Sequence, residues 1–159
     1  MVQDRCRIRH RPCTTRRSRP AGRVGGGILG RMTPEDSMQI HALLADYGHV
    51  VDDHDWDRAH EVFAPDFVFD RSASGRPDLH GIDDIVANFK GRNMYAHLTV
   101  NTTRTGIDAD TVRGHSKFIG FPNEGPPVTG DYHDEIVRTP AGWRLRHRRA
   151  EIRARKFFD

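Results

Sequence analysis

The sequence predicts an α+β fold in which helices come first and an antiparallel meander of strands follows. Two observations support this order. Apolar residues recur at helical spacing from residue 40 to residue 51, and polar and apolar residues then alternate along four segments between residues 94 and 153. The 159 residues are enough for one domain with a substantial core, and too few for two ordinary domains.

The first predicted helix begins at Thr33-Pro34-Glu35-Asp36. Thr33 can accept hydrogen bonds at the helix start, Pro34 suits the first helical position, and the two acidic residues favour the positive end of the helix dipole. The apolar stripe that follows runs for about five turns and ends near residues 53–54. Its members are Ile40, Leu43, Leu44, Tyr47, Val50 and Val51.

Shorter elements fill the next part of the chain. A second helix is predicted over residues 56–63, because Asp55 can cap its start and Ala64-Pro65 stops it. Residues 67–69 are the first predicted strand, and residues 71–78 are a polar loop. A third helix begins at Gly81 and ends at Gly91.

The strands of the meander are predicted over residues 94–107, 111–121, 128–138 and 142–153. Turn-forming residues separate the first two strands at 108–110 and the last two at 139–142. Strict alternation puts two sets of residues on common faces, where they can line a cavity or pack normally: Tyr132, Asp134 and Ile136, and Trp143, Leu145 and His147.

The charge of the chain divides after residue 31. The whole chain has 25 basic and 22 acidic residues, but residues 1–31 hold nine arginines and a single acid, Asp4. The rest of the chain therefore holds 16 basic and 21 acidic residues, a net charge of −5. This charge disfavours a nucleic-acid partner, because phosphate contacts need a basic face.

Residues 1–31 are expected to be a disordered, Arg-rich tail, because they have no hydrophobic period and cannot bury a core. The other interpretations are an arm that contacts nucleic acid, a transit peptide, and translated upstream sequence. Both cysteines, Cys6 and Cys13, lie in this segment, so a disulfide framework or a Cys nucleophile is excluded for residues 32–159. No apolar run approaches the roughly 18 residues that span a membrane, and we expect a cytoplasmic protein without a membrane partner.

The motifs of several common chemistries are absent from the sequence. It contains no P-loop, no strand-linked G-x-G-x-x-G and no G-x-S-x-G motif. Residues 32–159 contain nine histidines but no H-E-x-x-H motif and no histidine pair at i, i+4, so we expect no metal site. What remains is acid–base chemistry by Asp, His and Tyr side chains, without a cofactor.

His97 is the main candidate for that chemistry. Strict alternation along its strand puts it on the same face as Tyr95, Thr99 and Asn101, and a face with such polar groups suits the wall of a pocket. The alternative is a half-buried histidine with a structural role. His115, on the next strand, is a weaker candidate of the same kind.

Three acidic residues, Asp52, Asp53 and Asp55, crowd the end of the first helix, where anions oppose the helix dipole by about 0.3–1 kcal/mol each. This cost indicates another role for one of them without saying which. On a helical wheel Asp52 lies about 140° from the centre of the apolar stripe, which by itself predicts exposure to solvent.

Residues 33–155 resemble the nuclear-transport-factor-2-like superfamily, in its SnoaL-like branch. A D-x-x-D-W-D motif followed by F-x-x-D carries the resemblance. The matching segments are Asp52-Asp53-His54-Asp55-Trp56-Asp57-Arg58, Phe63-Ala64-Pro65-Asp66, Leu79-His80-Gly81, residues 97–101, and Gly142-Trp143-Arg144-Leu145. The resemblance implies that residues 32–159 form a cone-shaped domain, with three helices packed in a strongly curved antiparallel sheet around a central pocket.

By motif, the chain is most similar to the scytalone dehydratases and hexachlorocyclohexane dehydrochlorinases of that branch. Both are cofactor-independent lyases that use an Asp–His dyad, and the resemblance places this dyad at Asp52 and His97. The candidates for substrate binding are Tyr132, Asn101, Trp56, His115 and Arg138.

The resemblance has departures. The dehydratase has a tyrosine before the dyad aspartate, where this chain has Val51, and its second catalytic histidine lies further along its strand than His115 does. Arg138 lies near the position of a pocket arginine of the dehydrochlorinase. The resemblance therefore carries the dyad, but not the groups that assist a leaving group.

Two hypotheses of function follow. The first is a cofactor-independent lyase or isomerase, of dehydratase, dehydrohalogenase or cyclase type, in which Asp52 orients His97 as a base toward a small hydrophobic, cyclic substrate. The alternative is a non-catalytic small-molecule-binding or accessory subunit of the same fold. With either function we expect a homo-oligomer, a dimer or trimer, for which Leu98 and Val100 offer apolar surface on the outer face of the sheet.

Overall fold

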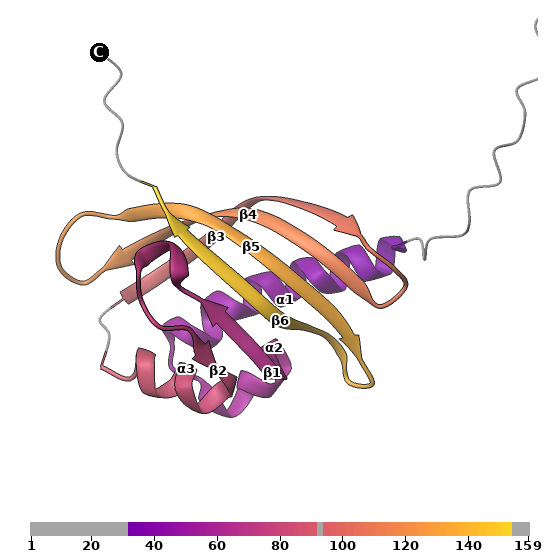
Figure 1. Ribbon diagram of the computed structural model, residues 1–159, viewed down its shortest axis with the longest axis horizontal. Coiled ribbons are helices and arrows are strands. Elements are labelled where there is room, and N and C mark those ends of the chain that lie inside the picture. Colours follow the sequence, from indigo (N-terminus) through magenta and orange to yellow (C-terminus); the bar gives the residue numbers. More distant parts are fainter. Residues whose placement is uncertain (1–31, 92–93, 154–159) are drawn as a thin grey trace, which may run out of the picture.

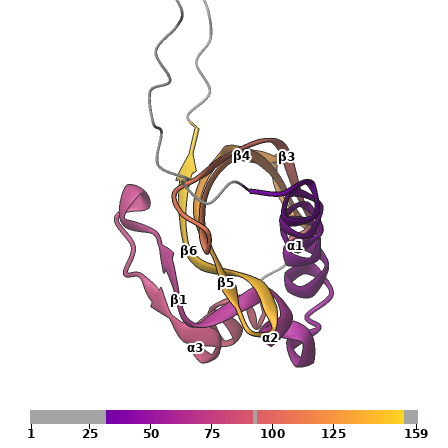
Figure 2. The same ribbon diagram turned by 90° about the vertical axis from the view of Figure 1, so that its right-hand side faces the viewer.

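The computed structural model describes residues 32–91 and 94–153. A strongly curved sheet wraps around one long helix (Figures 1 and 2). The predicted tail over residues 1–31 lies outside the described residues. Within the described ranges, no helix is both long enough and apolar enough to cross a membrane.

The order of elements is α+β, as the sequence predicts. The helices are α1 (Pro34–Asp52), α2 (Ala59–Val62) and α3 (Gly81–Phe89), with two short 3-10 turns, η1 (Trp56–Arg58) and η2 (Ser72–Ser74). The strands are β1 (Phe63–Asp70), β2 (Leu79–His80), β3 (Met94–Gly106), β4 (Thr111–Pro122), β5 (Val128–Thr139) and β6 (Gly142–Ile152).

The least accurate expectation concerns residues 56–69. The expected second helix is only η1 followed by a single α-helical turn, and β1 begins at Phe63 rather than at residue 67. Pro65 explains this early change, because the residue before a proline disfavours helical backbone.

The strands form one sheet in the order β2-β1-β6-β5-β4-β3. Every neighbouring pair is antiparallel except β1 and β6, which run parallel. The sheet is therefore mixed, which corrects the expectation of a wholly antiparallel one. The connection from β1 to β6 contains β2, α3 and the strands β3, β4 and β5, so it is long enough to bring two parallel strands together.

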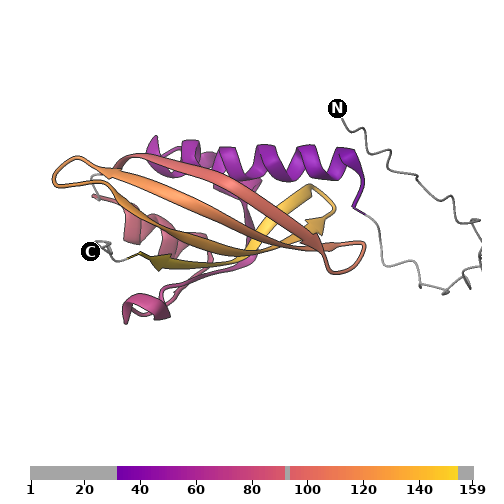
Figure 3. The ribbon, with the colours of Figure 1, turned by 90° about the horizontal axis from the view of Figure 1, so that it is seen from above.

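The core lies between the concave face of the sheet and the helices. Its largest members come from α1, β1 and the inner positions of β4, β5 and β6. Figure 3 shows α1 running alongside the long strands. Because β3 is the last strand of the sheet, α1 lies against its free edge as well as over the concave face.

Three β-bulges change which side chains face the core. The pairing of β3 with β4 shifts register at Tyr95, and again between Val100 and Thr103, where Asn101 has a positive φ of 54°. The pairing of β6 with β5 shifts between Leu145 and His147. An extra residue reverses the alternation beyond it, so strict alternation is wrong for the residues on the far side of each bulge.

Asp36 connects the start of α1 to the sheet. Its Oδ2 accepts hydrogen bonds from the backbone N and the Oγ1 of Thr33, at 3.0 and 2.8 Å, and the Thr33 Oγ1 accepts from the Asp36 backbone N at 3.1 Å. Its Oδ1 accepts from the Trp143 Nε1 at 3.2 Å and pairs with the guanidinium of Arg138. The hydrogen bond from the Thr33 backbone, followed by the one from Arg138, holds the pKa of Asp36 well below its usual range.

We expect Asp36→Asn to destabilise the fold at pH 7, and the effect to shrink in acid. A carboxyl whose pKa is lowered by folding stabilises the native state above its unfolded pKa, about 3.9, and this contribution is lost as pH falls through the folded pKa. Urea unfolding at pH 7, 5 and 3 measures the difference between variant and wild type. Asp66→Asn, at an exposed position of β1, is the control. A difference that stays constant down to pH 3 would contradict the assignment.

Candidate functional site

Helix α1 lies against the free edge of β3 at Gly48. A Cβ atom at this position would lie 3.1 Å from the backbone carbonyl oxygen of His97, which is tighter than ordinary contact. Glycine therefore allows the helix to lie against the strand. Asp52 follows one helical turn later, so it reaches the same residue of the strand from the same side.

The Asp52 carboxylate holds His97 at two points. Its Oδ2 accepts a hydrogen bond from the His97 backbone N at 2.6 Å, and its Oδ1 bonds the ring nitrogen Nδ1. Only 12% of the Asp52 side chain and 6% of the His97 side chain are exposed. The described residues offer no hydrogen bond to the other ring nitrogen, Nε2, which is therefore free to meet a ligand.

The His97 ring forms part of the wall of a cavity of about 130 Å³. Tyr47 and Phe89 pack edge-on against this ring, each with its centroid 6.5 Å away. Tyr132 and Phe118, stacked on each other at 4.4 Å, form another part of the wall. The remaining lining residues are Phe69, Arg71, Ser74, Arg76, Asn88, Met94, Val128, Ala150 and Ile152.

A buried ion pair supports the two tyrosines. Arg148 donates from Nε and Nη2 to the two carboxylate oxygens of Asp134, both at 2.8 Å, and neither side chain is more than 1% exposed. The guanidinium carbon of Arg148 lies 4.1 Å from the ring centre of Tyr47 and 4.0 Å from that of Tyr132. These ring faces attract the cation.

Burial sets the protonation of this group. Loss of solvent raises the pKa of both tyrosine hydroxyls, for Tyr132 well above its ordinary value, so both stay protonated at neutral pH. Burial opposes the charge of Arg148, but the Asp134 carboxylate outweighs it and keeps the pKa of the guanidinium above its ordinary range. Arg148 therefore stays charged in its buried place beside Asp134.

Of the five residues predicted to bind substrate, the structure brings only Tyr132 to the cavity beside His97. Asn101 is exposed, because the bulge at residues 101–102 takes it out of the inner face. Trp56 begins η1 and stacks on His54, with ring centroids 5.5 Å apart. It packs against the core just beyond the C-terminal end of α1 and does not line the cavity.

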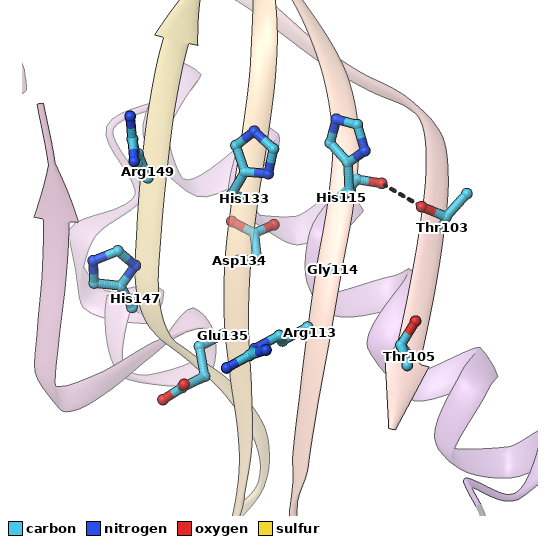
Figure 4. Close-up of a pocket in the computed structure, with 10 residues that line it drawn as sticks. All are labelled: Thr103, Thr105, Arg113, Gly114, His115, His133, Asp134, Glu135, His147 and Arg149. Carbon is cyan, nitrogen blue, oxygen red and sulfur yellow. Dashed lines mark hydrogen bonds between the residues drawn. The ribbon is translucent and has the colours of Figure 1, made fainter. Parts of the chain in front are cut away.

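His115 lies on the opposite face of the sheet from the cavity. Its neighbours Gly114 and Ser116 are buried on the inner side, so alternation turns His115 outward. It stacks on His133 at 4.6 Å and its Nε2 lies 2.9 Å from an oxygen of Asp131. Figure 4 shows it in a shallow hollow beside other polar side chains of the outer face. In the described part of the chain, no three His, Cys, Asp or Glu side chains are arranged to hold a metal ion.

Arg138 is engaged elsewhere. Its guanidinium pairs with Asp36 and lies over the ring of Trp143, 4.3 Å from the ring centre. It therefore holds the start of α1 to the end of the β5–β6 hairpin, and it does not line the cavity. Because Arg138 lies near the end of β5, it contacts Asp36 and Trp143 rather than a substrate in the cavity.

Five polar residues of the cavity could not be predicted from the sequence: Tyr47, Arg71, Ser74, Arg76 and Asn88. Tyr47 belongs to the apolar stripe of α1, so it was expected only in the core. Arg71 and Arg76 lie in the loop between β1 and β2, and Asn88 lies on α3. A loop has no periodicity that indicates a direction. The only signal available was that residues 71–78 contain two arginines and one acid, while residues 32–159 as a whole have a net charge of −5.

The chain is similar to an uncharacterized protein of Mycobacterium tuberculosis, with 32% identity over 127 residues that span 69% of this chain and 80% of that one. A candidate aromatic ring hydroxylase from Novosphingobium aromaticivorans has a similar structure, with a TM-score of 0.68, 30% identity, and coverage of 79% and 94% of the two chains. A candidate scytalone dehydratase from the same organism has a TM-score of 0.64 at 16% identity, over 76% of this chain and 85% of its own, which shows a common fold.

The profile of the SnoaL-like domain family matches residues 32–149. The match takes in the helices, the strands up to most of β6, and both residues of the Asp52–His97 pair. The chain therefore belongs to the SnoaL-like domain family.

Proposed function

We propose that the protein is a cofactor-independent lyase or isomerase that removes a proton from a carbon atom of a small cyclic substrate. The observation that carries this proposal is the Asp52–His97 pair, which is joined at two points and whose histidine ring forms part of the wall of a cavity that also contains five Phe and Tyr side chains. A buried carboxylate beside a histidine that faces a cavity is a typical acid–base arrangement.

The pair favours one form of the histidine. With Nδ1 donating its proton to the Asp52 Oδ1, the lone pair of the neutral ring lies on Nε2. When Nε2 accepts a proton from the substrate carbon, the ring becomes positive, and the adjacent carboxylate stabilises that charge. Because the His97 backbone N fixes the other oxygen of Asp52, the carboxylate is already oriented before the substrate binds.

The reaction type then depends on what happens to the electron pair that the proton leaves on the substrate. If a neighbouring carbon takes the proton back from Nε2, the product is an isomer; if a neighbouring bond to a leaving group breaks, the product is an alkene. We assign Tyr132 to hydrogen-bond the substrate oxygen or leaving group, because it lines the same cavity and burial keeps its hydroxyl protonated. The aromatic wall excludes water from the charged intermediate.

Deuterium exchange tests the proposal without knowledge of the natural substrate. Cyclic ketones with an acidic C–H, with and without a β-hydroxyl group, are incubated with the protein in D₂O and followed by NMR. We expect deuterium incorporation or elimination that requires His97 and is absent in His97→Gln. His133→Gln, on the outer face, is the matched control and should behave as wild type. Equal rates in wild type and His97→Gln would reject the proposal.

A further inference from the structure

We infer that the substrate of this cavity is a single-ring carboxylic acid, whose ring enters the cavity and whose carboxylate pairs with Arg71 and Arg76 at the rim. The inference rests on the proposed function in one respect: the cavity beside His97 is taken as the substrate site. It adds an anionic group to a substrate that the sequence alone describes only as hydrophobic and cyclic.

The size and lining of the cavity set the ring. A volume of about 130 Å³ is close to that of apolar protein cavities that admit one benzene molecule, about 150 Å³. Phe69, Phe89 and Phe118, with Val128, supply an apolar lining. There is room for one six-membered ring, and not for a fused polycyclic substrate, so a substituent of the ring lies at the rim of the cavity.

The charge of the lining sets the substituent. Two arginines line the cavity, and no Asp or Glu does. The lining is therefore positively charged, whereas residues 32–159 as a whole have a net charge of −5. Both arginines come from the polar loop that follows β1, which Figure 1 shows beside the C-terminal half of β6. An anion in this cavity meets two positive groups and no acidic one among the lining residues.

Arg71 is held in place without being neutralised. Its Nε donates to the backbone carbonyl of Pro77 at 2.8 Å and its Nη1 to the Asn88 Oδ1 at 2.7 Å, and both acceptors are uncharged. Asp78 accepts from the backbone N of Arg71 rather than from its guanidinium. Among the described residues, neither Arg71 nor Arg76 forms an ion pair.

A guanidinium that is removed from water attracts an anion more strongly than an exposed one, and fully buried arginines are usually paired with a carboxylate. Here Arg71 is partly buried, is oriented by two neutral groups, and keeps its Nη2 donors available. Arg76 belongs to the same loop, where its backbone N approaches the Arg71 carbonyl at 3.4 Å. A carboxylate is the anion whose flat, two-oxygen geometry suits guanidinium donors.

Binding of benzoate and of benzamide tests the inference, because the two probes have nearly the same shape and differ in charge. Isothermal titration calorimetry at pH 8 measures the dissociation constant of each. We expect benzoate to bind about tenfold tighter than benzamide to the wild type, which is the size of effect that charged hydrogen bonds give.

Two variants remove the preference in different ways. Arg76→Gln deletes one cation, and Asn88→Asp places a carboxylate on the Arg71 Nη1 and neutralises that cation within the protein. Each should weaken benzoate binding about five- to tenfold and leave benzamide binding unchanged. Arg113→Gln is the matched control, since Arg113 is an exposed arginine on the outer face of the sheet and its loss should change neither constant. Melting temperatures verify that each variant folds.

The outcomes separate this inference from the proposed function. If benzoate has no advantage over benzamide, if neither probe binds, or if Arg76→Gln and Asn88→Asp keep the full preference, the inference is wrong, whatever the exchange assay shows. If the preference disappears in His97→Gln instead, the carboxylate pairs with His97 and the inference is also wrong. If the preference follows Arg71 and Arg76 while no exchange is detected, the carboxylate site stands and the proposed chemistry does not.

Discussion

Replacing His97 by alanine is expected to abolish proton abstraction while the protein keeps its fold. Among the described residues, His97 is the only histidine that lines the cavity, and its Nε2 has no hydrogen-bond partner there. A general base contributes about 10²–10⁴-fold to a rate. The deuterium-exchange rate measures the effect, and the circular dichroism spectrum measures the fold. Unchanged exchange in His97→Ala would leave His97 as a structural residue.

Asp52→Asn tests whether the Asp52 carboxylate is needed to orient the His97 ring. The amide oxygen can still accept the His97 backbone N, but an amide that meets Nδ1 with its NH₂ group favours the wrong ring tautomer, so the rate should fall roughly 10²–10⁴-fold. Because Asp52 acts through His97, the double variant should be scarcely slower than His97→Ala alone. Asp53→Asn, at the exposed next residue, is the control. Fully additive effects would show that the two residues act separately.

The largest loss of stability is expected from Asp134→Ala. This change leaves the guanidinium of Arg148 fully buried without its counter-ion, and breaking a buried pair in this way costs about 3–5 kcal/mol. Such a loss is a large share of the roughly 5–15 kcal/mol by which a domain is stable. Urea unfolding followed by circular dichroism measures the difference in the free energy of unfolding.

A neighbouring ion pair on the same two strands provides the control. Glu135 pairs with Arg146, but both side chains are partly exposed, so Glu135→Ala should cost no more than about 1 kcal/mol. Replacing both members of the buried pair, with Arg148→Met and Asp134→Leu, should restore much of the stability, because the buried charge is then absent. If Asp134→Ala costs no more than Glu135→Ala, Arg148 does not depend on the Asp134 charge.

The periodic elements could be predicted from the sequence, and the irregular ones could not. The cap at Thr33 and the apolar stripe after it predict α1 correctly, and alternation gives the four long strands nearly to the residue. The bulge before His147 carries no such signal. It turns His147 to the surface and buries Arg148, which strict alternation would expose. A charged residue is rarely buried, so composition gave no reason to expect it in the core.

In the candidate site, likewise, periodicity predicts the place of one residue and fails for the other. His97 lies between the two bulges of β3, where alternation is regular, so its inward direction could be predicted. Asp52 lies off the apolar stripe, and a helical wheel assumes that a helix is buried on one face only. Here α1 also contacts the edge of a strand, and that second contact covers Asp52. Only the family resemblance indicated its place.

The contact between Asp52 and the backbone of His97 has a consequence for association as well. A strand at the end of a sheet exposes N–H and C=O groups to which a strand of another molecule can add, and this is a common route to aggregation. At the middle of β3, the Asp52 carboxylate occupies the N–H of His97, and the backbone of α1 at Gly48 covers its carbonyl. The two bulges on either side interrupt the regular edge further. The residues that orient the histidine therefore also cover this edge of β3. We expect Asp52→Ala, which leaves the His97 N–H without an acceptor, to make strand addition by a second molecule easier.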